Sequence, residues 1–282
     1  MTSIAVVTDS TADLPPDLCA QYGIRVVPTV LIIHGRQYLD EPGSLSRQEF
    51  FARLPEMHPP PTTAAPSSGA FKQVYRNLLA EGYTHILSIH LAASLSGVYQ
   101  VARLAAQNLN EAAITILDSG QITLGLGFQV LEAARSALQG LSLEGILQRV
   151  HSVQERIHLL AMLDTLEYVR RSGRVSWARA ALGALLDIKP FVSLQAGRVL
   201  RAGQTRTRRK GLLRLQERLN ALGPLEYLAL LHSNAPQDAR ALQQAHLHPV
   251  AFPPLLVNIT PVLGTHVGPQ GVGFVAVPKP QP

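Results

Sequence analysis

The feature that most constrains this chain is the alternation, through its first half, of short apolar runs with stretches of helical periodicity. Short apolar runs that end at polar or turn residues predict strands, and apolar residues three and four positions apart predict helices. Strands that alternate with helices are typical of βαβ units, which build a mostly parallel sheet with flanking helices. The predicted strands or extended stretches are 4–10, 24–35, 84–90 and 113–119, and the predicted helices are 69–82, one from about 96, 123–138 and 142–155.

Three of the predicted strands are followed by small polar residues. TDST (8–11) closes the first strand, SLSG (94–97) lies just after the third, and DSGQ (118–121) closes the fourth. In open parallel sheets, ligands bind where the carboxyl ends of the strands lead into helices. We therefore expect a ligand site lined by hydroxyl groups along this edge of the sheet.

The second half of the chain has a different pattern. Residues 157–165 predict a strand, helical pieces flank Gly173, and residues 188–203 predict a hairpin that turns at Gly197. A further helix and three more apolar, strand-like runs follow. We expect an α/β protein of two domains, with the polar loops in residues 1–155 and a mixed α/β domain in residues 156–282.

Composition narrows the class of protein. Of the 282 residues, 46% are apolar and 16% are charged, which favours a folded chain over a disordered one. A single cysteine, Cys19, excludes an intrachain disulfide and a cysteine metal cluster. The chain has no apolar run of the ~18 residues that a membrane helix needs, and its N-terminus does not resemble a signal peptide. We expect a cytoplasmic protein without integral membrane association.

The SLSG stretch has two interpretations. Serine is a favoured helix N-cap, so the stretch can simply cap the helix that follows. A helix N-terminus with open N–H groups also binds anions, and a second hydroxyl-rich stretch, PTTAAPSS within the predicted loop 58–68, lies one βα unit earlier. Neither the phosphate-binding pattern GxxxxGK[ST] nor a dinucleotide GxGxxG after the first strand is present. A carboxylate needs fewer donors than a phosphate and fits two hydroxyls and an amide.

Other site classes have weaker support. A serine hydrolase would use Ser94 or Ser96 with His266, but neither serine has the GxSxG context of a nucleophile elbow. His246 and His248 form an HxH pair in a predicted loop without accompanying carboxylates, so we expect no metal site. We expect Asp9 to cap the first helix, Glu167 to pair with Arg171 one helical turn later, Asp164 to serve a structural hydrogen bond, and Trp177 to serve packing.

The basic residues are distributed unevenly. The chain carries a net charge of +6, and its stretch 198–214 holds six arginines and Lys210 without an acidic residue. Nucleic acid is one partner for such a stretch. It contains no aromatic residue for stacking on bases and no DNA-reading motif, so we expect no nucleic-acid binding.

Several motifs together resemble those of the DegV family. In chain order they are TDSTADLP (8–15), PTTAAPS (61–67), ASLSGVYQVA (93–102), LDS (117–119), LDTLEYVRRSGRV (163–175), DIKPFVSLQAGRV (187–199) and HVGPQGVG (266–273). The resemblance implies a two-domain α/β fold that binds a long-chain fatty acid, such as palmitate or oleate, between its domains, with the C-terminal domain closing over the acyl chain. It implies a lipid carrier without catalytic residues or a further cofactor.

The resemblance also assigns roles to particular residues. The family's carboxyl-binding threonine falls on Thr63, with Thr62 adjacent, and its serine falls on Ser94 or Ser96 beside Gly97. Arg206 and His266 correspond to residues near the carboxyl group. The glycines on either side of His266, Gly264 and Gly268, predict a flexible loop there. The expected partner is a bacterial fatty acid kinase, which forms an acyl phosphate for phospholipid synthesis.

The chain also departs from the family pattern, and an enzyme stays open as an alternative. Gln270 stands where the family has glycine, which bears on the step with the kinase. The alternative is a serine-dependent esterase, or another small-molecule enzyme, that uses Ser96 and His266. Because each buried methylene contributes roughly 0.8 kcal/mol, a fatty acid binds tightly with few polar contacts, which fits a site with two or three hydroxyls.

Overall fold

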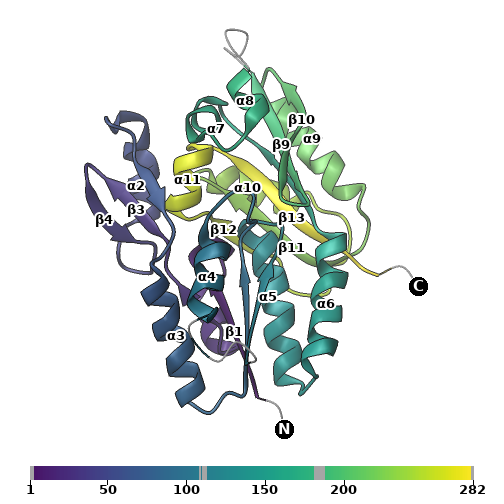
Figure 1. Ribbon diagram of the computed structural model, residues 1–282. Coiled ribbons are helices and arrows are strands. Elements are labelled where there is room, and N and C mark those ends of the chain that lie inside the picture. The colour runs from purple at the N-terminus through teal and green to yellow at the C-terminus, as the bar shows by residue number, and fades with distance from the viewer. Residues whose placement is uncertain (1–2, 108, 110–112, 181–187, 281–282) are drawn as a thin grey trace. The chain divides into compact units, whose positions relative to one another are not determined.

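The computed structural model describes residues 3–107, 109, 113–180 and 188–280 (Figure 1). The chain divides into two compact units: unit 1 comprises residues 1–32, 36–44 and 63–155, and unit 2 comprises residues 33–35, 45–62 and 156–282. Unit 2 thus contains a segment from the first half of the chain. Helix α2 (Arg47–Arg53) of this segment packs against α11 (Pro261–Val267) near the C-terminus.

Unit 1 is built on a four-stranded parallel sheet, which confirms the parallel arrangement predicted from the alternation. The strand order is β2-β1-β6-β7, and every neighbouring pair is parallel. In register, His90 at the end of β6 lies opposite Asp118 at the end of β7. The polar strand ends therefore share one edge of the sheet. The strands are β1 (Ile4–Asp9), β2 (Arg25–Val27), β6 (His85–His90) and β7 (Ile114–Asp118).

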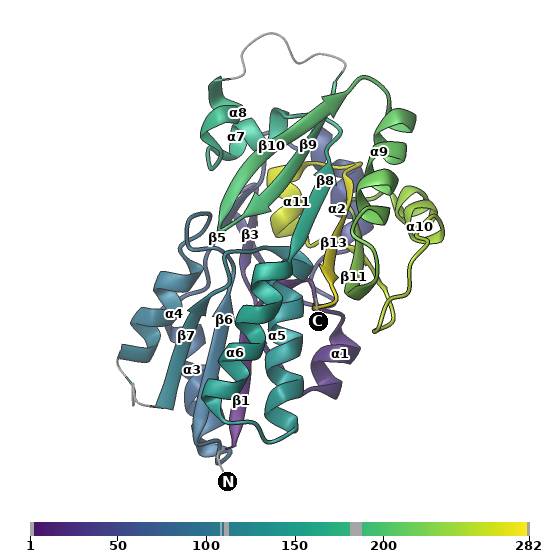
Figure 2. The same ribbon diagram turned by 90° about the vertical axis from the view of Figure 1, so that its right-hand side faces the viewer.

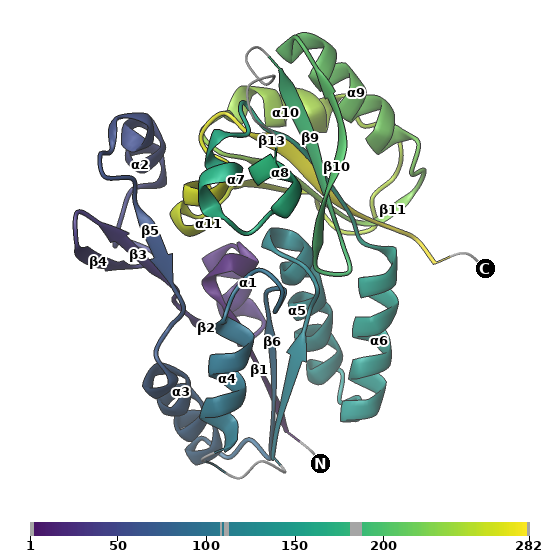
Figure 3. The same ribbon diagram turned by 45° about the horizontal axis from the view of Figure 1, so that its top comes forward.

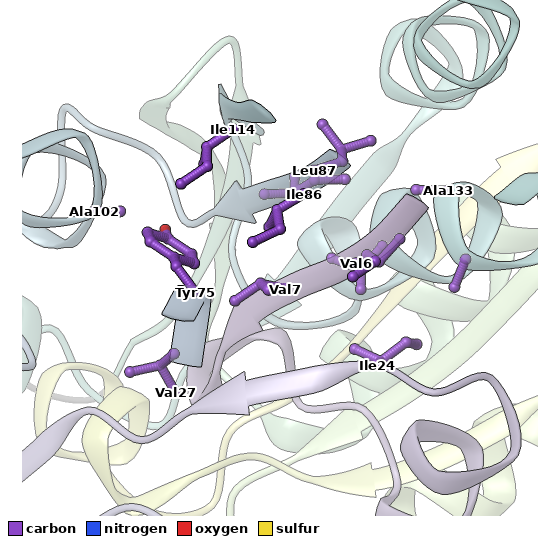
Figure 4. Close-up of a cluster of buried hydrophobic side chains, with 14 of the residues drawn as sticks. Val6, Val7, Ile24, Val27, Tyr75, Ile86, Leu87, Ala102, Ile114 and Ala133 are labelled. Carbon is purple, nitrogen blue, oxygen red and sulfur yellow. The ribbon is translucent and has the colours of Figure 1, made fainter. Parts of the chain in front are cut away.

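Helices cover both faces of this sheet. Helices α3 and α4 pack against each other and against one face, and α5 packs against the other. Figure 4 shows the consequence inside the core: Val7 and Ile86 point toward Tyr75 of α3, and Val6 and Leu87 point toward Ala133 of α5. Both sheet faces are buried, as a parallel sheet requires. The helices of unit 1 are α1 (Pro16–Gln21), α3 (Ser68–Ala80), α4 (Val98–Gln107), α5 (Thr123–Leu138) and α6 (Leu143–Arg156), with a 3₁₀ turn η1 (Ser10–Ala12) after β1.

A smaller sheet corrects two sequence predictions. Strands β3 (Val30–Ile33), β4 (Arg36–Leu39) and β5 (Thr62–Ala64) form a three-stranded sheet in the order β4-β3-β5. The extended stretch 24–35 is therefore two strands of different sheets, separated at Pro28. The predicted loop 58–68 was wrong at Thr62–Ala64, where three residues bounded by Pro61 and Ala65 are too few for an alternation to be visible in the sequence.

Unit 2 contains a six-stranded mixed sheet, which confirms the predicted mixed α/β character. The order is β10-β9-β8-β13-β11-β12, and Figure 2 shows β10, β9, β8 and β13 side by side. Only β11 and β12 pair in parallel; the other pairs are antiparallel, including the predicted hairpin of β9 and β10. The strands are β8 (His158–Met162), β9 (Lys189–Gln195), β10 (Arg198–Thr205), β11 (Leu225–His232), β12 (Leu255–Asn258) and β13 (Val272–Pro278).

The two faces of this sheet carry different helices (Figure 3). Phe191 of β9 packs in a cluster with residues of α9 (Arg208–Asn220) and α10 (Pro236–Gln244). The next residue, Val192, packs with residues of α7 (Glu167–Ser172) and α8 (Ser176–Ala180). Because successive strand residues point to opposite faces, α9 and α10 cover one face and α7 and α8 cover the other.

Four predictions about single residues are confirmed. The Asp9 carboxylate caps η1 by accepting from Thr11 N–H over 3.1 Å. Arg171 and Glu167 form the expected ion pair, Asp164 accepts a hydrogen bond from Lys189, and Trp177 Nε1 donates to a backbone carbonyl within an apolar cluster. The described residues contain no group of three side chains that could hold a metal ion, and none of the described helices has the length and apolar character to cross a membrane.

Candidate functional site

In unit 1 the candidate site begins with the loop between β6 and α4. Ala92 N–H donates to the carbonyl of Gln121 over 2.9 Å, and Ala93 N–H donates to Asp118 Oδ1 over 3.2 Å. These bonds tie the loop to the turn that follows β7. Backbone hydrogen bonds therefore position the segment that contains the serines.

Ser96 and Gly97 form the start of α4. The carbonyl of Gly97 accepts from Val101 N–H over 3.0 Å, and Ser96 Oγ accepts from Val98 N–H over a longer 3.4 Å. An oxygen that accepts from the backbone keeps its own proton to donate. The half-buried Ser96 hydroxyl can therefore donate to an anion at the helix N-terminus, whereas Ser94 is exposed.

Asp9 lies behind this loop and is completely buried. Its Oδ1 accepts from the N–H and the hydroxyl of Thr11, and its Oδ2 accepts from Leu91 N–H over 3.2 Å and from His90 Nδ1 over 3.0 Å. Leu91 is the first residue of the serine loop. One carboxylate thus joins the ends of β1 and β6 and fixes the point where the loop begins.

A chain of buried polar side chains continues from Asp9 into the core. His90 Nε2 lies 2.7 Å from Ser88 Oγ, which lies 2.9 Å from the hydroxyl of Tyr75. Nδ1 donates to the carboxylate, because a carboxylate only accepts. Burial raises the pKa of Tyr75, so its phenol stays protonated. We did not anticipate this row of hydrogen-bonded side chains, although Ser88 and His90 are two residues apart in β6, which places them on one face.

The hydrogen bonds that join Ser88, His90 and Asp9 have the connectivity of a Ser-His-Asp triad, but these side chains are not accessible to a substrate. Ser88, His90 and Asp9 each have no exposed surface, so no substrate reaches the serine. Ser96, the nucleophile of the esterase alternative, has no hydrogen bond to a histidine or carboxylate among the described residues. Neither serine therefore has the geometry that nucleophilic catalysis needs.

The two predicted threonines are adjacent residues of strand β5. Thr62 is exposed and Thr63 is half-buried. Side chains of neighbouring strand residues point to opposite faces, so only one of them can line a given site. The burial favours Thr63 and argues against a shared role for Thr62.

In unit 2 His266 lies beside an arginine that was not predicted. Arg174 Nη1 lies 3.3 Å from His266 Nδ1. Arg174 follows the turn at Gly173, which ends α7 with φ 71°, and it belongs to the RRSGR segment. That segment was a signal in the sequence, but the contact joins residues 92 positions apart.

The electrostatics fix the protonation of His266. Burial, together with the positive charge of Arg174, lowers the pKa of His266 to about 3. The ring is therefore neutral near pH 7. A guanidinium only donates, so Nδ1 accepts from Arg174 and the proton of the ring is on Nε2. His266 thus offers a neutral N–H donor, and Arg174 supplies positive charge behind it.

Close helix packing holds His266 in place and corrects a prediction. We expected His266 in a flexible loop, but it lies in α11, which begins at the N-cap Thr260. A Cβ at Gly264 would lie 2.3 Å from the Phe51 ring, and one at Gly268 would lie 2.3 Å from Tyr168. The glycines that suggested a loop are instead required where α11 contacts α2 and the Tyr168 side chain.

Arg206 and Gln270 differ in how they are held. Arg206 is exposed in the bend between β10 and α9, and it makes no hydrogen bond or ion pair within the described part of the chain. Gln270 has a left-handed backbone with φ 63°, which explains why glycine is favoured there. Its side chain donates to the carbonyl of Asn234 over 3.0 Å, so the substitution keeps the turn in place.

The predicted site residues are thus divided between the units. Unit 1 contains Thr63, Ser94, Ser96 and Gly97, and unit 2 contains Thr62, Arg206 and His266. Unit 1 supplies hydroxyl donors beside a helix N-terminus. Unit 2 contains the imidazole of His266 beside Arg174, and Arg206, which is unpaired within the described chain.

Comparisons with known proteins agree with this fold. The model of the DegV family of uncharacterised proteins matches residues 3–279. The chain belongs to the DegV family. A DegV domain-containing protein of Deinococcus radiodurans is 35% identical to this DegV protein over 280 residues, which cover 98% of this chain and 99% of the relative.

Solved structures of other DegV proteins have the same fold. A DegV family protein from Thermus thermophilus, described as fatty acid binding, is 34% identical with a TM-score of 0.88, over 98% of this chain and 99% of that one. DegV from Bacillus subtilis, a fatty acid binding protein, is 29% identical with a TM-score of 0.84, over 99% and 100% of the two chains. These matches confirm the predicted family and the two-domain α/β fold class.

Proposed function

We propose that this DegV protein binds a long-chain fatty acid such as palmitate or oleate and presents its carboxyl group to a separate fatty acid kinase. The kinase would form an acyl phosphate for phospholipid synthesis. The observation that carries the binding proposal is the 34% identity, over nearly the full chain, to a fatty acid binding DegV protein.

The hydroxyls of Thr63 and Ser96 are proposed to hold the carboxylate. Ser96 accepts from Val98 N–H and keeps its proton for a ligand, at the N-terminus of a ten-residue helix. A helix N-terminus carries a partial positive charge, which stabilises a carboxylate. Two hydroxyls and this field suffice because the acyl chain supplies most of the affinity through its buried methylenes.

His266 and Arg206 are proposed to serve the phosphorylation step. The neutral His266 Nε2–H can donate to a carboxyl oxygen without forming a tight ion pair that would hold the carboxylate back from the kinase. Arg206 is exposed and unpaired within the described chain, so its guanidinium is available to an incoming phosphoryl group.

Lipid extraction of the purified protein tests the binding proposal. We expect mass spectrometry of the organic extract to detect a long-chain fatty acid at a stoichiometry close to one per chain. Protein stripped of lipid should take up added oleate. Protein that contains no fatty acid and takes up neither palmitate nor oleate would contradict the proposal.

A further inference from the structure

A pocket of about 440 Å³ lies within unit 2, between the sheet and the C-terminal half of α9. Its walls are mostly apolar and include Leu160, Phe191 and Phe274, while Arg214 and Arg218 of α9 line one side. The volume is within the range of small-molecule sites. Phe191 belongs to the face covered by α9, so the sheet separates this pocket from the α7 and α11 side, where His266 lies.

The charge of this pocket is positive and uncompensated. Arg214 and Arg218 are one helical turn apart, where like charges repel. No acidic side chain lines the pocket, and within the described chain neither arginine forms an ion pair. An oxyanion between the two guanidinium groups would remove this repulsion.

Arg214 is held in position before any ligand arrives. Its guanidinium lies over the ring of Phe191 at 5.2 Å from the centroid. It also lies against Gly203 on β10, where a Cβ would be 3.0 Å from a guanidinium nitrogen and the backbone has φ +124°. The register of β9 and β10 shifts between Arg201 and Gly203, which marks an irregularity at this point. A guanidinium fixed by an aromatic ring and a glycine loses little freedom when it binds an anion.

We propose that this pocket binds a small amphipathic anion, with a short apolar chain against Leu160, Phe191 and Phe274 and one carboxylate or phosphate head group between Arg214 and Arg218. Guanidinium groups form bidentate hydrogen bonds with both kinds of head group. Ser193 and Gln195, which also line the pocket, supply neutral polar groups beside the chain. The site is distinct from the fatty acid site proposed above and does not depend on it.

Calorimetric titration tests this site with octyl phosphate, octanoate and uncharged octanol as probes. The protein is first saturated with oleate, which keeps eight-carbon chains out of a fatty acid site. We expect octyl phosphate or octanoate to bind at least tenfold more tightly than octanol, and their ratio identifies a phosphate or a carboxylate ligand. Equal binding of all three probes, or no binding of either anion, would overturn the proposal.

Variants locate the binding. R214Q/R218Q should weaken anion binding at least tenfold, while R209Q, which removes an exposed arginine of the same helix outside the pocket, should leave it unchanged. A221W keeps both arginines and fills the rim of the pocket, so it should also abolish binding. Unchanged affinity in both pocket variants would contradict the proposal. Oleate content, measured by mass spectrometry in each variant, separates a loss at this pocket from a loss of the fatty acid.

Discussion

The carboxylate of Asp9, at the end of β1, accepts a hydrogen bond from His90 Nδ1, at the end of β6, over 3.0 Å, and neither side chain has any exposed surface. The same carboxylate accepts from Leu91 N–H, where the serine loop begins. One buried carboxylate therefore joins the ends of β1 and β6 to the start of the serine loop. Sequence separation of 81 residues makes this a purely tertiary relationship.

Replacing Asp9 with asparagine should destabilise the protein by about 3 kcal/mol. The amide has one accepting oxygen where the carboxylate has two, and its NH₂ group would face N–H donors. Urea unfolding measures the change. D17N, an exposed acid in the first turn of α1, is the control and should cost at most about 1 kcal/mol. Equal unfolding midpoints for D9N and D17N would show that the buried hydrogen bonds of Asp9 contribute little to stability.

Two adjacent threonines give a matched test of the carboxylate site. T63V should weaken oleate binding by about 1.5–3 kcal/mol, at least tenfold, because a hydrogen bond to a charged group is lost. T62V changes an exposed residue on the opposite face of β5 and should bind as the original protein does. Titration of lipid-free protein with oleate measures both. A larger effect from T62V would place the carboxyl group on the other face of the strand.

The lowered pKa of His266 predicts that the protein loses stability on acidification. Its folded-state pKa of about 3 lies below its ordinary value of 6.5, so below pH 6.5 the unfolded chain binds a proton that the folded chain does not. Stability is therefore complete above about pH 6.5 and falls as the pH drops toward 3. Between pH 7 and pH 5 this residue should lower the free energy of unfolding by up to about 2 kcal/mol, at about 1.4 kcal/mol per pH unit. The free energy of unfolding of H266Q should change less over that interval, and equal changes in both proteins would contradict the shift.

Two helical glycines should respond to alanine in opposite directions. At Gly264 a Cβ would lie 2.3 Å from the Phe51 ring, so G264A should cost about 1–3 kcal/mol by overpacking. At Gly145 of α6 the closest atom is 3.6 Å away, and alanine should stabilise by about 0.4–1 kcal/mol through its lower unfolded-state entropy. Thermal unfolding measures both changes. If G264A were as stable as G145A, α11 would not pack as closely on α2 as the structure indicates.

The sequence was sufficient to predict the strands and helices that have a local pattern of apolar and polar residues. The strand ends at Asp9, His90 and Asp118 follow apolar runs directly, so the polar edge of the parallel sheet could be predicted. Strand β5 could not, because its three residues lie beside Pro61 and form a strand only by pairing with β3. Helix α11 was missed for a related reason: its glycines mimic a loop signal but serve close contact with other helices.

The candidate site could likewise be predicted only in part, because some of its features depend on tertiary contacts. Hydroxyls in loops after strands were visible in the sequence, and the family resemblance selected Thr63 and Ser96 among them. The pairing of Arg174 with His266 was not visible, because two helices must pack before the side chains meet. Nor could the sequence show that Ser88 contacts Tyr75 or that His90 contacts Asp9, since each of these hydrogen bonds joins two different elements.

The last prediction separates lipid retention from presentation to the kinase. Arg206 is exposed and unpaired within the described chain, and His266 offers a neutral donor, so neither provides the main affinity for an acyl chain. R206A and H266A should keep their fatty acid but lose at least tenfold in the rate of phosphorylation by a bacterial fatty acid kinase.

The control for both variants is R198A, which removes another exposed arginine of the same basic stretch from β10. Lipid content is measured by mass spectrometry and acyl phosphate formation by transfer of labelled phosphate from ATP. R198A should be phosphorylated at the original rate if position, and not total charge, matters. Full phosphorylation of both R206A and H266A would show that these residues do not serve the transfer step, and equal losses in all three variants would assign the effect to general electrostatic attraction of the kinase.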